Sequence, residues 1–170
     1  MSDPITPAPD QYDSEPAEGS AGFKSCAIRA VKSARMQIAL LSQTLDRGVY
    51  GTADFIEPLT TFLLAHERAQ LRVLLRRPDV VMKSGHRLVE LGRRRLSSRV
   101  SFRELSPERQ QSEQELLVAD ESAVLLRESP LEVTARYWPH APLEARTRLR
   151  EFETLWQDAT PATELHSLGI

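Results

Sequence analysis

Carboxylate side chains at Glu113, Glu115 and Asp120 flank a short apolar run, and their spacing could support chemistry. Alternate residues of a strand face the same side, so Glu113 and Glu115 would project together. Grouped carboxylates can bind a divalent cation. Solvated residues at a strand edge explain the pattern equally well, and we therefore predict no metal site.

A second candidate is the stretch Ser84-Gly85-His86-Arg87, which is placed at the expected start of a helix. Free backbone N–H groups at a helix N-terminus favour an anion, and basic side chains nearby would add to this. The alternative is structural: Ser84 caps the helix, Gly85 allows close packing and His86 makes an internal hydrogen bond. The residues assigned to the anion site are Arg76, Arg77, Lys83, Ser84, Gly85, His86, Arg87 and Arg94.

Charge is segregated along the chain, although the formal net charge is only −2. Residues 68–103 hold eleven basic residues against two acidic ones, while residues 1–21 hold five acidic residues and no basic one. Such a basic segment could bind phosphate or nucleic acid. The acidic flanks could equally neutralise it once the chain folds, so both interpretations stay open.

The sequence contains no Gly-x-Gly-x-x-Gly run, no Walker loop and no Gly-x-Ser-x-Gly elbow. Its four histidines are scattered, and Cys26 is the single cysteine, so we predict neither a zinc site nor an internal disulfide. We expect no cofactor. A lone cysteine fits a reducing compartment, which favours the cytoplasm.

Apolar patterning predicts helices that alternate with strands. Helical spacing occurs near residues 20–34, 52–66, 84–96 and 142–159, and strand-like runs occur at 36–41, 71–75, 100–103, 116–119, 123–126 and 133–138. This alternation indicates right-handed crossovers and an α/β fold, with a mixed, largely parallel sheet flanked by helices.

One domain is expected over residues 22–160, followed by a short C-terminal tail over residues 161–170. Residues 1–21 are rich in proline and acidic residues, which is typical of a disordered acidic tail. No apolar run approaches the roughly 18 residues that span a bilayer, so we expect no membrane association. The N-terminus also lacks the basic start and apolar core of a secretory signal.

With this order of elements, residues 22–160 resemble a single domain of the phospholipase D superfamily. The resemblance rests on the helix–strand alternation, on Glu113–Ser129 aligned with the strands of the His-x-Lys-x-x-x-x-Asp signature, and on a last helix ending Phe152-x-x-Leu155-Trp156. It implies a nucleophilic His, a Lys that holds the phosphate, an Asp that supports the His, and a Gly-Ser-x-Asn stretch. Two such motifs would meet across a pseudo-twofold or a dimer axis, which implies a homodimer.

In this chain Glu113 takes the place of the nucleophile and Glu115 that of the phosphate-holding Lys, and only Asp120 matches. Arg127-Glu128 stand at the expected Gly-Ser position. A carboxylate cannot supply the readily displaced phospho-histidine intermediate, and it repels a phosphate. The resemblance therefore predicts a degenerate, non-catalytic member, a pseudoenzyme without phosphodiesterase activity.

The run Ser84–Leu91 also resembles an uncharacterised bacterial group of this superfamily that is found beside N-acetyltransferase domains. This favours a regulatory or interaction module with an acyltransferase as a partner. A second hypothesis is binding of a phosphate-bearing ligand or nucleic acid through residues 76–95. A third is an enzyme of unrecognised chemistry around His86.

Overall fold

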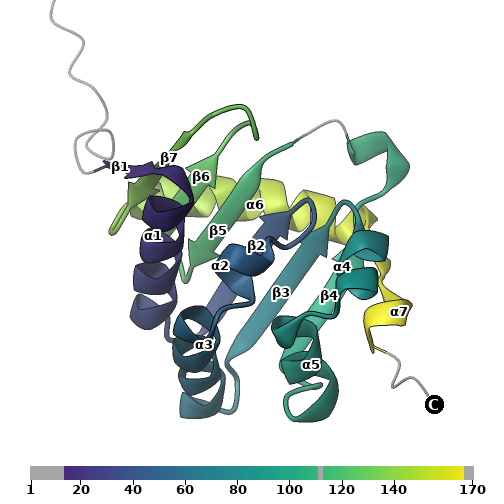
Figure 1. Ribbon diagram of the computed structural model, residues 1–170. Helices are drawn as coiled ribbons and strands as arrows, with labels where there is room; N and C mark the ends of the chain where they lie inside the picture. Colours follow the sequence, from purple (N-terminus) through teal and green to yellow (C-terminus); the bar gives the residue numbers. More distant parts are fainter. Residues whose placement is uncertain (1–13, 111–112, 167–170) are drawn as a thin grey trace, which may run out of the picture.

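The computed structural model describes residues 14–110 and 113–166, and a mixed sheet lies at its centre (Figure 1). Its strand order is β1-β7-β6-β5-β2-β3-β4-β8. The strands are β1 (Glu15–Glu18), β2 (Gln37–Ser42), β3 (Gln70–Leu75), β4 (Val100–Glu104), β5 (Glu115–Ala119), β6 (Ala123–Arg127), β7 (Thr134–Trp138) and β8 (Thr160–Pro161).

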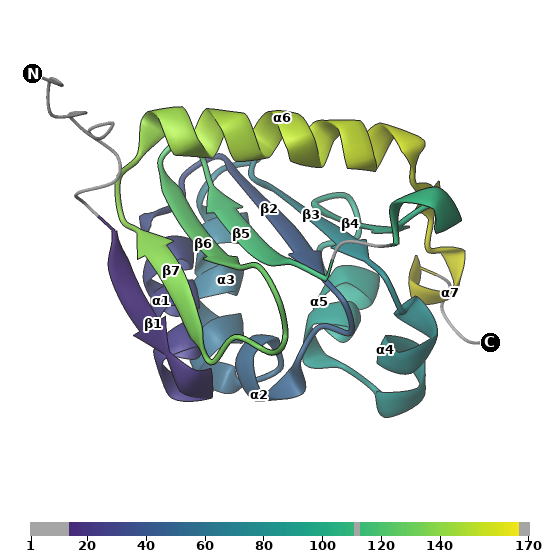
Figure 2. The same cartoon turned by 90° about the horizontal axis from the view of Figure 1, so that it is seen from above.

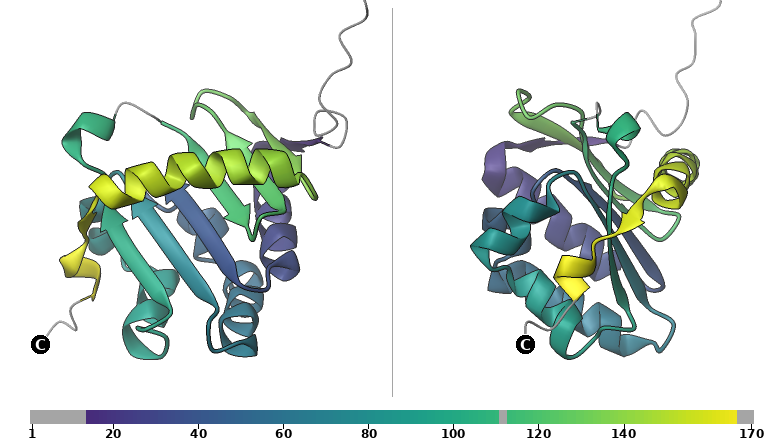
Figure 3. Two further views of the ribbon diagram at one scale, coloured as in Figure 1. Left: turned by 180° about the vertical axis from the view of Figure 1, so that it is seen from behind. Right: turned by 90° about the vertical axis from the view of Figure 1, so that its right-hand side faces the viewer.

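Helices cover both faces of the sheet. They are α1 (Gly19–Ser33), α2 (Arg47–Tyr50), α3 (Ala53–Ala65), α4 (Pro78–Ser84), α5 (Arg87–Arg94), α6 (Pro142–Asp158) and α7 (Thr163–His166), with a short 3-10 helix, η2, at Pro107–Arg109. Helix α6 runs across one face, while α1, α3 and α5 lie against the other (Figures 2 and 3). None of the helices in the described ranges is long and apolar enough to cross a membrane.

The α/β fold with a mixed sheet is confirmed, but the antiparallel share is larger than the alternation indicated. Of the described strands, β2, β3 and β4 pair in parallel, and helical crossovers join these neighbouring strands. Strands β5, β6 and β7 follow one another through turns and pair antiparallel, and β5 then pairs antiparallel with β2.

Two apolar cores lie on either side of the sheet, as strands covered on both faces require. In β2, Leu40 packs toward α1 and α3, while Leu41 packs toward α6. The expected anchors of α6 are confirmed: Phe152 and Trp156 are buried and stack with their ring centroids 5.8 Å apart. Arg72 lies over both rings and pairs with Glu153 at 2.6 Å.

Three expected boundaries need correction. The acidic tail was expected to reach residue 21, yet residues 15–18 form β1 on the edge of β7, with Ala17 buried, and α1 begins at Gly19; residues 1–13 lie outside the described part. The expected C-terminal tail instead contains β8 and α7, whose Leu165 is fully buried. The helix expected to open near Ser84 begins at Arg87 as α5, and the unpredicted helix α4 precedes it; Gly85, with a positive φ of 62°, separates the two.

Asp120 fixes the turn between β5 and β6 to the beginning of β2. Its carboxylate accepts hydrogen bonds from the backbone N–H groups of Arg35, Met36 and Gln37, at 2.9, 2.9 and 3.1 Å. Its own φ is 53°, a conformation that Asp and Asn tolerate better than most residues. The motif Asp thus has a structural role in this fold.

Substitution of Asp120 should destabilise the fold in a graded order. Asp120→Ala loses all three acceptor contacts and should cost about 2–3 kcal/mol in the free energy of unfolding. Asp120→Asn keeps the oxygen that faces Met36 and Gln37 but turns an amide group toward the N–H of Arg35, so its loss should be smaller. Urea unfolding measures both, and equal stabilities of the two variants would contradict this role.

Candidate functional site

Glu115 lies buried at the start of β5, at the position that corresponds to the phosphate-holding Lys. One carboxylate oxygen accepts a hydrogen bond from the hydroxyl of Ser42 at 3.1 Å and another from the N–H of Gln43 at 3.0 Å. The hydroxyl oxygen of Ser42 in turn accepts from the N–H of Leu45. Glu115 therefore ties β5 to the loop that follows β2.

Burial raises the pKa of Glu115, and its hydrogen bonds to Gln43 and Ser42, together with the charge of Arg127, offset only part of that rise. Arg127, at the end of β6, lies over the ring of Phe23 with 5.2 Å to the centroid. Two buried polar atoms near Glu115 make no hydrogen bond within the described residues: the hydroxyl of Tyr50 and Nε of Arg127. Burial, and next the charge of Glu115, raise the pKa of Tyr50 well above its usual value.

The three motif carboxylates do not form a common site. Glu115 and Asp120 stand at opposite ends of β5, and Glu113 is exposed ahead of the strand. Within residues 14–110 and 113–166, no group of three His, Cys, Asp or Glu side chains could hold a metal ion. Glu113, Glu115 and Asp120 are therefore not placed to share one divalent cation.

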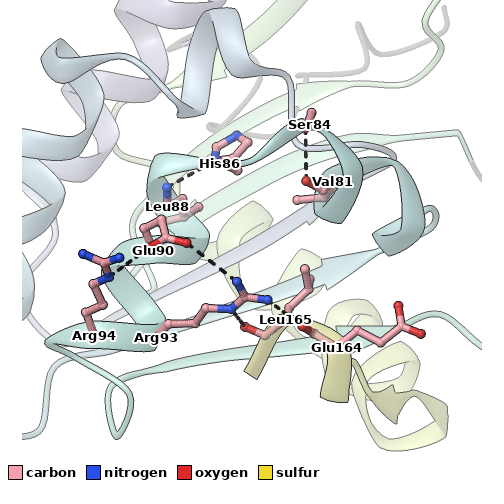
Figure 4. Close-up of polar contacts among 9 residues, drawn as sticks. All are labelled: Val81, Ser84, His86, Leu88, Glu90, Arg93, Arg94, Glu164 and Leu165. Atoms are coloured by element: carbon pink, nitrogen blue, oxygen red, sulfur yellow. Dashed lines mark hydrogen bonds and ion pairs between the residues drawn. The ribbon is translucent and has the colours of Figure 1, made fainter. Parts of the chain in front are cut away.

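His86 caps α5 with its own side chain (Figure 4). Nδ1 accepts from the N–H of Leu88 at 3.1 Å, and Nε2 lies 2.9 Å from the carbonyl oxygen of Leu45, so Nε2 carries the proton and donates. Only 3% of the residue is exposed, and burial lowers its pKa. The structural interpretation thus holds for His86. Its ring accepts from the N–H of Leu88, one of the helix N-terminal groups expected to attract an anion.

Other residues assigned to the anion site are engaged elsewhere. Ser84 ends α4 rather than capping the next helix, and its hydroxyl donates to the carbonyl of Val81 (Figure 4). Arg77 pairs with Asp79 at 3.1 Å, and Arg94 pairs with Glu90 at 3.1 Å. Arg76 donates to the carbonyl of Gln110. The structure does not bring these side chains together.

Much of the basic segment serves internal packing. Arg93 and Arg103 donate to the carbonyl oxygens of Leu165 and Trp156, at 2.9 and 2.8 Å, and Arg99 donates to that of Leu63. These contacts attach α7 to α5, α6 to β4, and α3 to the residue that precedes β4. Within the described ranges, four basic side chains of the segment make no hydrogen bond or ion pair: Arg68, Lys83, Arg87 and Arg95.

Arg87 lines a surface groove together with Arg47, a residue that the sequence did not single out. The groove has a volume of about 560 Å³ and lies between α2, the start of α3 and the start of α5. Its remaining lining residues are Gly48, Gly51, Thr52, Ala53 and Gly85. Of the expected anion-site residues, Gly85 and Arg87 meet here.

The N-terminus of α3 opens into this groove without a side-chain cap. The hydroxyl of Thr52 donates to the carbonyl of Val49 instead, and the N–H groups of Phe55 and Ile56 bond to the carbonyl of Thr52. The earlier N–H group of Ala53 has no acceptor among the described residues. Two exposed guanidinium groups and an uncapped helix of 13 residues thus share one hollow.

Comparisons with known proteins place the fold. A model of the family described as "Domain of unknown function (DUF7931)" matches residues 20–168. None of the curated protein sequences matches the chain.

Three solved structures share the fold at low identity. The phospholipase D family member Nuc from Salmonella typhimurium is 13% identical with a TM-score of 0.60, over 91% of this chain and 99% of Nuc. NucT from Helicobacter pylori is 7% identical with a TM-score of 0.61, over 87% of this chain and 98% of NucT. TrmBL2, an archaeal chromatin protein, is 12% identical with a TM-score of 0.62, over 93% of this chain but only 57% of TrmBL2. The fold is phospholipase D-like, as the sequence predicted.

Replacing Glu115 should separate its hydrogen bonds from its charge. Glu115→Ala leaves Ser42 and Gln43 without their acceptor and should cost about 1–3 kcal/mol in the free energy of unfolding. Glu115→Gln keeps an acceptor oxygen without a buried charge and should be at least as stable as the native chain at neutral pH.

The same pair predicts a pH dependence. Because the native pKa of Glu115 is raised above the usual 4.5, the folded chain holds its proton to higher pH than the unfolded chain does. The free energy of unfolding of the native chain, relative to Glu115→Gln, should therefore fall as pH rises from 4.5 through the native pKa of Glu115. Urea unfolding across a pH series measures this, and a difference that rises or stays constant would refute it.

The stability that His86 contributes should depend on pH in the opposite direction to that of Glu115. Its native pKa is lowered from the usual 6.5, so the unfolded chain takes up a proton first and stability should fall as pH decreases below that value. His86→Ala should lose about 2 kcal/mol, whereas His86→Asn keeps an acceptor for the N–H of Leu88 and should lose less. Thermal or urea unfolding should also show that the stability of both variants depends less on pH below 6.5 than that of the native chain.

Proposed function

We propose that this chain, which belongs to the family described as "Domain of unknown function (DUF7931)", is a non-catalytic phospholipase D-like domain that binds phosphate-bearing ligands, with nucleic acid as the main candidate. The observation that carries the proposal is the groove in which Arg47 and Arg87 converge on the uncapped start of α3.

The chemistry of the groove suits a phosphate group. Guanidinium groups donate paired hydrogen bonds to phosphate oxygens, and the N-terminal N–H groups of a helix add donors with a favourable dipole. Gly48, Gly51 and Gly85 keep part of the wall free of side chains, so backbone atoms can approach a ligand. Neither arginine would have to break an ion pair with a described residue to bind.

The absence of catalysis is supported by the surroundings of Glu115. A carboxylate stands where the resemblance requires a cation, and its hydrogen bonds to Ser42 and Gln43 hold it in place. Asp120, the remaining residue of the signature, is used by the backbone at the far end of β5. Glu115 therefore offers a phosphate no positive charge at this position.

Nucleic acid is favoured over a small phosphate ester for two reasons. The groove is open and carries arginines rather than an enclosed, selective pocket, which is typical of backbone contacts that do not read sequence. TrmBL2 is described as a chromatin protein with a novel mode of DNA binding. The fold of this chain matches 57% of the length of TrmBL2. A regulatory role beside an acyltransferase stays a prediction from the sequence.

Binding should depend on Arg47 and Arg87 and fall with salt. We expect Arg47→Ala/Arg87→Ala to bind labelled DNA and RNA at least about tenfold more weakly than the native chain. The slope of log affinity against log salt should become shallower by about 2, one for each lost phosphate contact. Fluorescence anisotropy over a salt series measures both quantities, with inorganic phosphate as a competitor.

The matched control is Arg68→Ala/Arg95→Ala, which removes the same charge from exposed side chains of the basic segment outside the groove. It should keep most of the affinity. If both double variants weaken binding equally, the groove is not the binding site. If the native chain binds neither DNA nor RNA at low salt, the nucleic-acid proposal is wrong.

A further inference from the structure

Helices α1 and α3 lie side by side (Figure 1). Side chains of both helices line an apolar furrow. The furrow has a volume of about 750 Å³, and its apolar lining residues are Ile28, Val31, Ala34, Pro58, Phe62 and Ala65. Leu64 on α3 is 62% exposed, and Met36, just after α1, is 43% exposed. Leu64 follows Glu57 by seven residues and Thr61 by three, so the three share one face of the helix.

The two helices carry opposite charge. Helix α1 contains Lys24, Arg29 and Lys32 and no acidic residue, whereas α3 contains Asp54 and Glu57 and no basic residue. Lys24 and Asp54 form an ion pair of 3.1 Å across one end of the furrow. Lys32 and Glu57 line the furrow as well, but neither forms an ion pair within the described part of the chain.

Lys32 and Glu57 lie on opposite sides of the furrow and at different distances from its end. The ion pair joins Lys24 in the second turn of α1 to Asp54 in the first turn of α3, so the helices start at the same end of the furrow. Lys32 lies about two turns beyond Lys24, while Glu57 lies about one turn beyond Asp54. A two-fold axis that passes between Lys32 and Glu57 would exchange their positions.

We propose that a second copy of this chain docks on the α1–α3 furrow around such an axis. Lys32 of each protomer then faces Glu57 of the other, so a single contact type is made twice, as an isologous dimer requires. Leu64 and the apolar floor of the furrow supply the buried surface between the two ion pairs. The polar rim and apolar centre match the usual composition of a dimer interface.

The edge at the start of β5, through which the family resemblance implies a dimer, is a poorer surface for a second copy. Glu113 and Glu128 are both exposed there, and a two-fold axis through this edge would bring like charges together. The furrow offers opposite charges instead, and Leu64 is exposed on the same helix as Glu57. Dimerisation through the furrow is independent of the anion groove between α2, α3 and α5.

The test is a charge exchange on the full chain, followed by sedimentation velocity over a concentration series. The native chain should show a concentration-dependent dimer. Lys32→Glu and Glu57→Lys should each raise the dissociation constant at least about tenfold, because each turns two attractions into two repulsions. The double variant Lys32→Glu/Glu57→Lys restores opposite charges across the axis and should return the dissociation constant to near its native value.

Two further variants complete the design. Leu64→Ser should weaken the dimer without affecting the fold, since most of the side chain is exposed, and circular dichroism with thermal unfolding checks this. Lys83→Glu reverses an exposed charge on α4, away from the furrow, and should leave the dimer unchanged. A chain that is monomeric at every concentration overturns the proposal, and so does a dimer that the exchange neither weakens nor restores.

Discussion

The antiparallel pairing of β2 with β5 is the constraint on which the rest of the structure depends, because it joins the parallel part of the sheet to the antiparallel part. A carboxylate fixes each end of the β2–β5 pair. Asp120 bonds to three backbone N–H groups at the start of β2, and Glu115 bonds to Ser42 and Gln43 where β2 ends. The residues that align with a catalytic signature thus determine the register of two central strands.

Arginine is used in this fold mainly as a long donor that reaches backbone carbonyls and aromatic rings. Arg72 and Arg103 both lie over Trp156, and Arg103 also donates to its carbonyl oxygen. Such contacts bury the stems of the side chains while satisfying their charged ends. They also explain how a strongly basic segment folds against an acidic C-terminal part and leaves few cations free. Arg87 is one of the few that stay free, and it lies with Arg47 in the groove that is open to a ligand.

The architecture was largely predictable because apolar periodicity depends on residues close in sequence. The buried runs of β2, β3 and β5 and the spacing of Phe152 and Trp156 in α6 were identified correctly. The edge strand β1 and helix α7 were missed, because their short segments are polar and become ordered only by pairing with β7 and by packing against α5. Helix α4 was missed because Arg76–Asp79 was interpreted as a loop, and Gly85 was interpreted as a packing residue instead of the positive-φ residue that separates α4 from α5.

The sequence by itself determined the fold class, the presence of Glu113 and Glu115 where the resemblance expects His and Lys, and the concentration of basic residues in the middle of the chain. Only the tertiary structure decided which of those basic side chains are free. Whether an arginine is paired depends on carbonyls and carboxylates that are distant in sequence, as Arg93 with Leu165 and Arg72 with Glu153 illustrate. The groove that joins Arg47 to Arg87, 40 residues apart, likewise exists only because α2, α3 and α5 are brought together on one face of the sheet.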